Sequence, residues 1–187
     1  MEEKDEQLII AYRSGNEYAF KTLIDRYTPL LYNYTRRFVG TLYASDIVQD
    51  VFIKAWRHIA TFDPARSSFK TWIFTITRNT VTDHLRKKKS LIFSELERVD
   101  DDESFADHIA DETALPDEVY SNLEDKEHLN RLLSELSPHY QEVLLLYYQE
   151  DMTFAEIGEV LQKPLNTVKS HHRRALEQLR KMSKNEM

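Results

Sequence analysis

The stretch SDIVQDVFIKAW, residues 45–56, contains the most regular hydrophobic pattern in the chain and indicates its fold class. Its apolar residues recur at intervals of three and four, the spacing that places side chains on one face of an α-helix. The pattern predicts an amphipathic helix over residues 45–59 with one broad buried stripe. The stripe comprises Ile47, Val48, Val51, Phe52, Ala55, Trp56 and Ile59.

Helices of the same kind are predicted on both sides of this stretch. An earlier apolar pattern predicts a helix over residues 17–38, in which Pro29 would introduce a kink or a break. A later pattern predicts a helix over residues 69–89. The chain contains only 3 Gly and 5 Pro, so few turns are expected. These features predict an all-α protein whose first helical domain spans residues 1–90.

The charge of the chain is divided unevenly along its length. The net charge is −7, from 25 Lys and Arg against 32 Asp and Glu. Residues 1–89 carry 15 basic and 10 acidic residues, a net charge of +5, and residues 90–128 carry 2 and 14, a net charge of −12. Residues 91–118 are acidic and lack sustained apolar periodicity, so they are predicted to be a linker. A second, smaller helical domain is predicted at residues 119–187.

The second domain contains the sequence features of a helix-turn-helix. Thr153 and Glu156 form a capping box at the start of a short apolar helix, and residues 162–164 interrupt it. Asn166 is expected to cap the next helix, which is strongly basic. Two short helices joined by a tight turn, with a basic second helix, are typical of DNA-binding domains. The alternative is a solvated helix in an ordinary bundle.

The first turns of the basic helix carry the side chains that would contact DNA. Polar residues at the N-terminal end of a recognition helix reach base edges, and Lys and Arg also pair with phosphates. The candidate contact residues are Asn166, Thr167, Lys169, Ser170, His171, Arg173 and Arg174.

Residues 62–89 interleave aromatic and basic side chains. Aromatic rings stack on unpaired bases and cations neutralise phosphates, so this composition suits single-stranded DNA. The alternative is structural, because Phe69 and Trp72 lie at helical spacing and such residues more often belong to a core.

The polar face of the 45–59 helix carries a third candidate site. Asp46, Gln49, Asp50 and Ile53 share this face. Isolated apolar residues are common on protein surfaces, so Ile53 is either a chance exposure or part of a docking site.

No catalytic site is expected. The chain has no Cys, which excludes disulfides and thiolate metal sites and fits a reducing cytoplasm. The 7 His residues are dispersed, and no metal, phosphate-loop or nucleophile motif is present. The acidic N-terminal sequence MEEKDEQLII lacks the apolar core of a signal peptide. We therefore expect a cytoplasmic, non-enzymatic protein that needs no metal and no cofactor.

The order and spacing of these motifs resemble the extracytoplasmic-function (ECF) type of bacterial RNA polymerase sigma factor over nearly the whole chain. Their succession across two domains makes the match specific, rather than any single motif. The chain departs from the family pattern at Asn166, where Gly is usual, and at His172, where an apolar residue is common. The matching stretches include SDIVQDVFIKAW at 45–56, FD at 62–63, FKTW at 69–72, LSP at 136–138, FAEIGEVL at 154–161 and TVKS at 167–170.

The resemblance implies a role for each candidate site. The face from Asp46 to Ile53 would bind the clamp helices of core RNA polymerase. Residues 61–78 would melt and read the minus-10 promoter element, and the basic run at 86–89 would hold the DNA backbone. The helix-turn-helix would read the minus-35 element. The implied minus-10 contacts are Phe62, Arg66, Lys70, Trp72, Arg78, Asn79, Arg86 and Lys87.

The resemblance also implies partners. These are core RNA polymerase, promoter DNA and an anti-sigma factor, often one tethered to the membrane, whereas the chain itself is not expected to insert into a membrane. The strong negative charge of the linker suits a basic nucleic-acid channel. The same charge should keep the affinity of the free protein for DNA low.

Two other functions are weighed against this one. A stand-alone helix-turn-helix regulator would account for residues 166–171 but would leave the first 90 residues without a role. A helical interaction protein that does not bind DNA would not need the basic side chains at 169, 173 and 174.

Overall fold

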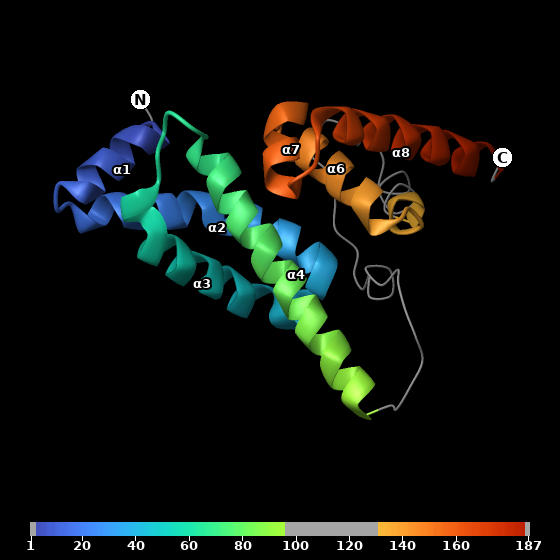
Figure 1. Cartoon of the computed structure of the whole chain (residues 1–187), viewed down its shortest axis with the longest axis horizontal. Helices are drawn as coiled ribbons and strands as arrows, with labels where there is room; N and C mark the ends of the chain where they lie inside the picture. Colours follow the sequence, from blue (N-terminus) through green and yellow to red (C-terminus); the bar gives the residue numbers. More distant parts are fainter. Residues whose placement is uncertain (1–2, 96–130, 186–187) are drawn as a thin grey trace. The chain divides into compact units, whose positions relative to one another are not determined.

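The computed structural model describes residues 3–95 and 131–185 (Figure 1). Every regular element within these residues is helical, which confirms the predicted all-α class. The chain forms two compact units, one on each side of the segment 96–130. The helices are α1 (Asp5–Arg13), α2 (Glu17–Val39), α3 (Thr41–His58), the 3₁₀ turn η1 (Ile59–Thr61), α4 (Phe69–Glu95), α6 (Pro138–Tyr148), α7 (Phe154–Leu161) and α8 (Leu165–Asn185).

In the first unit, α2, α3 and α4 pack against one another, and α1 packs on α2 (Figure 1). The predicted stripe of α3 is buried except for Trp56, which is 57% exposed. The prediction that Trp56 is buried is therefore wrong, because this residue lies in the last turn of α3, at the margin of an open groove. The largest fully buried side chains of the unit are Leu8, Ile9, Leu23, Leu31, Tyr34, Val51, Phe69, Ile73 and Phe74.

Local signals set the ends of α2. The side chain of Asn16 accepts a hydrogen bond from the backbone N–H of Tyr18, which caps the helix. Gly40, with φ 78°, ends α2 and directly precedes α3. This left-handed conformation favours glycine, so the tight turn between the two helices follows from the residue type. Pro29 lies inside α2 and does not divide it.

Helix α4 begins at Phe69, as predicted, but continues to Glu95. Residues 91–95 were predicted to belong to the linker, so that boundary is wrong, and the linker beyond them lies outside the described residues. Threonine hydroxyls on α4 donate to the carbonyl four residues earlier, so the β-branched residues satisfy their polar groups within the helix. These bonds, each 2.8 Å long, come from Thr75, Thr77, Thr80 and Thr82.

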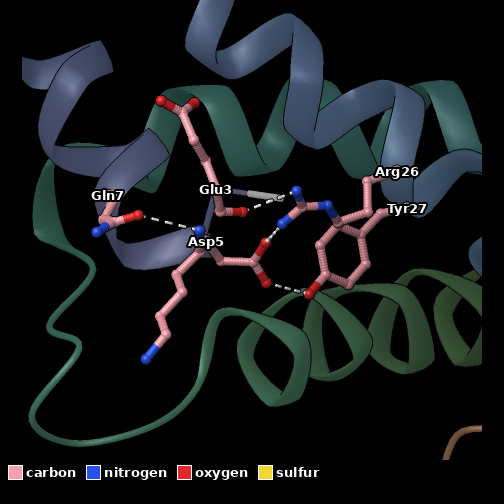
Figure 2. A network of polar contacts seen from close by, with 6 residues as sticks. Glu3, Asp5, Gln7, Arg26 and Tyr27 are labelled. Carbon is pink, nitrogen blue, oxygen red and sulfur yellow. Dashed lines mark hydrogen bonds and ion pairs between the residues drawn. The ribbon is translucent and has the colours of Figure 1, made fainter. Parts of the chain in front are cut away.

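A polar network fastens α1 to α2 (Figure 2). Asp5 accepts hydrogen bonds from the guanidinium of Arg26 and from the hydroxyl of Tyr27, and Arg26 also donates to the carbonyl of Glu3 at 2.9 Å. Burial, and then the hydrogen bond to Asp5, raises the pKa of Tyr27 far above its ordinary value. The hydroxyl therefore stays protonated and acts as the donor.

The second unit packs α6 and α7 against α8. Pro138 lies in the first turn of α6, and Thr153 with Glu156 forms the predicted capping box of α7. Four buried residues, Leu133, Leu136, Leu144 and Ala175, form one core cluster.

Helix α8 begins at Leu165, directly after Pro164. The carbonyl of Pro164 accepts hydrogen bonds from the N–H groups of Thr167 and Val168 at 2.9 and 3.1 Å. Asn166 is therefore the second residue of the helix, and the prediction that it caps the helix is wrong. The chain reverses at Gln162, where φ is 53°, and Pro164 occupies the position before the first helical residue. Among the described helices, none has both the length and the apolar character needed to span a bilayer.

Candidate nucleic-acid and protein interfaces

The structure brings the four residues of the predicted polar face together on the outer side of α3. Asp46, Gln49 and Asp50 are exposed, and Ile53 is 40% exposed. Their spacing of three and four residues places them on one side of the helix. The face therefore combines two carboxylates and an amide with one accessible aliphatic side chain.

An open apolar groove between α2 and α3 borders this face, with a volume of about 490 Å³. Gln49 and Ile53 belong to both surfaces, and the exposed ring of Trp56 lies at the end of the groove. The sequence gives no sign of this groove, because helical periodicity predicts that Trp56 lies in the buried stripe. The other lining residues are Phe20, Ile24, Thr28, Tyr32, Ser45, Val48 and Phe52.

The aromatic residues at the start of α4 form a cluster with Phe62. The Phe62 ring is 4% exposed and lies edge-on against Phe69, with ring centroids 5.8 Å apart. Its centroid is 5.2 Å from that of Trp72, which is only partly buried. Phe62 and Phe69 therefore belong to the core, and of the three rings only Trp72 has accessible surface for stacking on a base.

The loop between η1 and α4 is held by hydrogen bonds at both ends. Arg13 of α1 donates to backbone carbonyls at its start, and the Ser68 hydroxyl accepts from the N–H of Thr71 at 3.1 Å at its end. Within the loop, the Asp63 carboxylate accepts from the N–H of Ala65 at 3.0 Å, a turn that side-chain oxygens of this type favour. Arg13 could not be identified from the sequence, because its partners lie 46 to 49 residues away.

Apart from the buried Phe62, the residues predicted to contact the minus-10 element lie along the loop and α4. Arg66, Asn79, Arg86 and Lys87 are exposed, whereas the others are partly buried. Arg86 lies 3.6 Å from Asp83 on the exposed surface, a weak pair that competing phosphates can replace. The partly buried members of the set are Lys70, Trp72 and Arg78.

The helix-turn-helix is formed by α7, the turn at Gln162 and α8. Asn166, Lys169, Arg173 and Arg174 are exposed on the first turns of α8. Arg173 pairs with Glu177 at 2.8 Å on the exposed surface. The remaining predicted contacts, Thr167, Ser170 and His171, are half-buried.

Two histidines face each other between α6 and α8. The rings of His139 and His171 have centroids 4.9 Å apart, and Tyr140 lies edge-on to His171 at 5.6 Å. Burial lowers the pKa of His171, and the positive charges of His139, Lys163 and Arg174 lower it further. The two imidazoles are therefore predominantly neutral near pH 7.

His172 lies in a pocket of aromatic rings on the other side of α8. Its ring centroid is 4.8 Å from that of Tyr147, 5.1 Å from Phe154 and 5.6 Å from Tyr148. Its Nε2 atom is buried without a hydrogen-bond partner, and burial lowers the pKa of this side chain. His172 thus fills a site that suits an apolar residue.

No three potential metal-ligating side chains gather anywhere in residues 3–95 and 131–185.

Two family models match separate parts of the chain. Residues 23–91 match Sigma-70 region 2, and residues 126–179 match Sigma-70, region 4. The first match includes α3 and α4 with the loop between them, and the second includes the helix-turn-helix.

Relatives of known function are similar to nearly the whole chain. The chain is 32% identical over 171 residues to the ECF RNA polymerase sigma factor SigW of Bacillus subtilis, covering 90% of this chain and 91% of SigW. It is 30% identical over 168 residues to the ECF RNA polymerase sigma factor RpoE of Cereibacter sphaeroides, covering 88% and 86% of the two chains.

A solved structure has a similar fold. It is the sigma factor RpoE of Bartonella quintana in complex with the anti-sigma factor NepR, with a TM-score of 0.66 and 24% sequence identity. The similarity covers 88% of this chain and 96% of that one.

Proposed function

Since the chain belongs to the ECF family of RNA polymerase sigma factors, which direct promoter-specific transcription initiation, we propose that each of its two units has a separate role. Residues 1–90 bind core RNA polymerase and read the minus-10 element. Residues 119–187 read the minus-35 element, and the acidic residues that follow α4, 96–118, link the two. The observation that carries this proposal is the exposed face of α3, which lies in the same unit as a preformed loop and a basic helix.

The polymerase contact is formed by Asp46, Gln49, Asp50 and Ile53. All four are exposed, and two of them, Gln49 and Ile53, also line the apolar groove between α2 and α3. An aliphatic side chain ringed by polar groups is the composition of a small protein–protein hot spot.

The minus-10 contacts are the exposed or partly exposed members of the predicted set. Phe62 is left out because its buried ring cannot stack on a base without disrupting the core. Trp72 is the ring with accessible surface. The proposed residues are Arg66, Lys70, Trp72, Arg78, Asn79, Arg86 and Lys87.

The minus-35 contacts lie on the first turns of α8. Exposed Lys169, Arg173 and Arg174 supply the cations, and Asn166 an amide that can pair with a base edge. Thr167, Ser170 and His171 complete the set.

The protein performs no catalysis of its own and acts in the cytoplasm, where RNA polymerase works. Its activity is controlled by an anti-sigma factor, by analogy with the complex described for the Bartonella quintana protein. A stand-alone DNA-binding regulator is not favoured, because such a protein has no use for a sigma region 2.

The test is reconstitution with purified core RNA polymerase, followed by transcription from a promoter library. The full chain should bind core enzyme one to one and initiate at a defined subset of promoters. Absence of promoter-specific initiation across the library would refute the function.

The polymerase contact is tested by charge reversal. Asp50→Lys should weaken binding to core enzyme, measured by fluorescence anisotropy, because it places a cation where the partner surface complements an anion. Asp25→Lys, at an exposed position on α2, makes the same change in charge and should leave the affinity unchanged. Equal effects of the two substitutions would exclude Asp50 as a specific contact.

The minus-35 contact is tested by truncation. Arg174→Ala should weaken recognition of the upstream element by about 1–3 kcal/mol if Arg174 reads a base. Arg180→Ala removes an exposed cation further along α8 and serves as the control. An unchanged base preference in the Arg174 variant would remove it from the set.

A further inference from the structure

Arg13, in the last turn of α1, holds the backbone where the loop between α3 and α4 begins. Its Nη2 atom donates to the carbonyl oxygens of Ile59 at 2.7 Å, Phe62 at 2.5 Å and Ala60 at 3.3 Å. Carbonyls at the C-terminal end of a helix lack partners within the helix. The guanidinium is permanently charged and has donors in a rigid arrangement, so it satisfies these carbonyls and fixes their direction.

The loop that follows is fixed at its other end as well. The Ser68 hydroxyl caps α4 by accepting from the N–H of Thr71, and the buried ring of Phe62 packs against Phe69. Between these anchors, residues 63–66 are exposed, whereas Ser67 and Ser68 are partly buried. The loop is therefore a short exposed segment held between two fixed ends.

Arg13 is itself presented by an anchored helix. Leu8 and Ile9 of α1 are each 1% exposed, and Asp5 binds Arg26 and Tyr27 of α2 (Figure 2). Helix α1 thus connects the body of the unit to the start of the loop.

We propose that Arg13 is a positioning residue for reading the minus-10 element. It holds residues 62–68 in the conformation that receives unpaired bases, without itself touching the DNA. This inference rests on the proposed function of the loop. When the loop is already ordered, DNA binding carries no entropy cost for ordering it. A loop of fixed shape also excludes bases that do not fit that shape. Removing Arg13 should therefore reduce selectivity among bases more than it reduces binding to the polymerase.

The experiment compares four full-length proteins as holoenzymes: the unsubstituted chain, Arg13→Ala, Arg13→Lys and Lys21→Ala. Lys21→Ala removes an exposed cation on α2 that pairs with Asp25 and does not touch the loop. Each holoenzyme transcribes a plasmid library randomised through the minus-10 element, and the transcripts are sequenced. Affinity for core enzyme and the thermal midpoint are measured for each variant alongside.

In Arg13→Ala, the ratio of transcription from preferred to disfavoured minus-10 sequences should fall by about threefold to tenfold, with affinity for core enzyme unchanged. Arg13→Lys should give an intermediate ratio, because Lys keeps the positive charge but is shorter than Arg and lacks its planar guanidinium group. Lys21→Ala should behave like the unsubstituted chain.

Several results would overturn the inference. Unchanged selectivity in Arg13→Ala would exclude a positioning role. A uniform loss of transcription across the library, fully restored by Lys, would identify Arg13 as a phosphate contact. A uniform loss that follows a lower thermal midpoint would identify a purely structural role. If the unsubstituted chain itself shows no promoter preference, the proposed function fails instead, so the two failures are distinguishable.

Discussion

Gly158 lies within α7, before the turn at Gln162, at a point with no space for a side chain. A Cβ atom built there would lie 2.9 Å from the carbonyl oxygen of Lys163. The N–H of Lys163 donates to the carbonyl of Gly158 at 2.9 Å, so the backbone cannot move away without breaking that bond. The glycine therefore permits the close approach that the helix-turn-helix requires.

Gly158→Ala should lower the free energy of unfolding of the second unit by about 1–2 kcal/mol, since the strain exceeds the gain in helix propensity. The measurement is urea unfolding followed by far-UV circular dichroism. The control is Ala155→Gly, at an exposed position of the same helix. It should lower the free energy of unfolding by about 1 kcal/mol, the ordinary difference in helix propensity between Ala and Gly. A stabilised Gly158→Ala protein would mean that the turn is free to relax.

His172 makes the stability of the second unit depend on pH. Its folded pKa lies below the ordinary value, so the unfolded chain binds the proton more tightly and stability falls as the pH drops below about 6.5. His139 and His171 shift in the same direction and contribute to the same loss.

His172→Phe should reduce this loss of stability between about pH 7.5 and about pH 5.5, because an apolar ring replaces a partly buried imidazole among Tyr147, Tyr148 and Phe154. Urea unfolding at the two pH values provides the measurement. His58→Phe replaces an exposed imidazole in the other unit and serves as the control for the substitution itself. An unchanged slope in His172→Phe would show that the other two histidines account for it.

At the scale of the elements, one carboxylate of α1 makes the polar side-chain contacts to α2, beside the apolar packing of Leu8 and Ile9. Asp5 accepts from Arg26 and from Tyr27, whose ring is 4% exposed. Asp5→Ala would leave the Tyr27 hydroxyl buried without an acceptor, and such a loss costs about 1–3 kcal/mol.

Asp5→Ala should lower the unfolding free energy of the first unit by that amount. The chain has 2 Trp, Trp56 and Trp72, and both lie in this unit, so tryptophan fluorescence reports its unfolding selectively. Adding Tyr27→Phe should recover part of the loss because it removes the unpaired hydroxyl. The control Asp25→Ala breaks an exposed pair with Lys21 and should change stability by less than about 0.5 kcal/mol.

At the scale of the whole molecule, charge is separated along the chain. The strongly acidic block at 90–128 carries −12, whereas residues 1–89 carry +5. The phosphate field of free DNA therefore repels one part of the chain and attracts another. The net effect should be weak DNA binding in the absence of polymerase.

Replacing Asp100, Asp101, Asp102 and Glu103 by the corresponding amides removes four negative charges and changes the net charge from −7 to −3. Affinity for a non-promoter duplex should rise several-fold at low salt, and the difference should shrink as salt screens the charges. Fluorescence anisotropy at two salt concentrations measures both effects. The control replaces each of the three Asp residues by Glu, and Glu103 by Asp. It keeps all four negative charges and should bind the duplex like the unsubstituted chain.

The sequence by itself determined the class of the fold and most of its helices. The period of residues 45–56 predicted α3, and the capping box at Thr153 and Glu156 marked the start of α7, because such signals act within a few residues. The residues of the polar face of α3 could be predicted for the same reason, because residues three or four positions apart lie on the same side of a helix.

The tertiary structure alone decided which of these side chains are accessible and which distant residues meet. Periodicity placed Trp56 in the core, but α2 leaves it exposed beside a groove, and composition suggested Phe62 for base stacking, but Phe69 and Trp72 bury it. No local pattern connects Arg13 to carbonyls more than 40 residues away. Burial and long-range hydrogen bonds depend on how helices pack against one another, so they become visible only when the chain is folded.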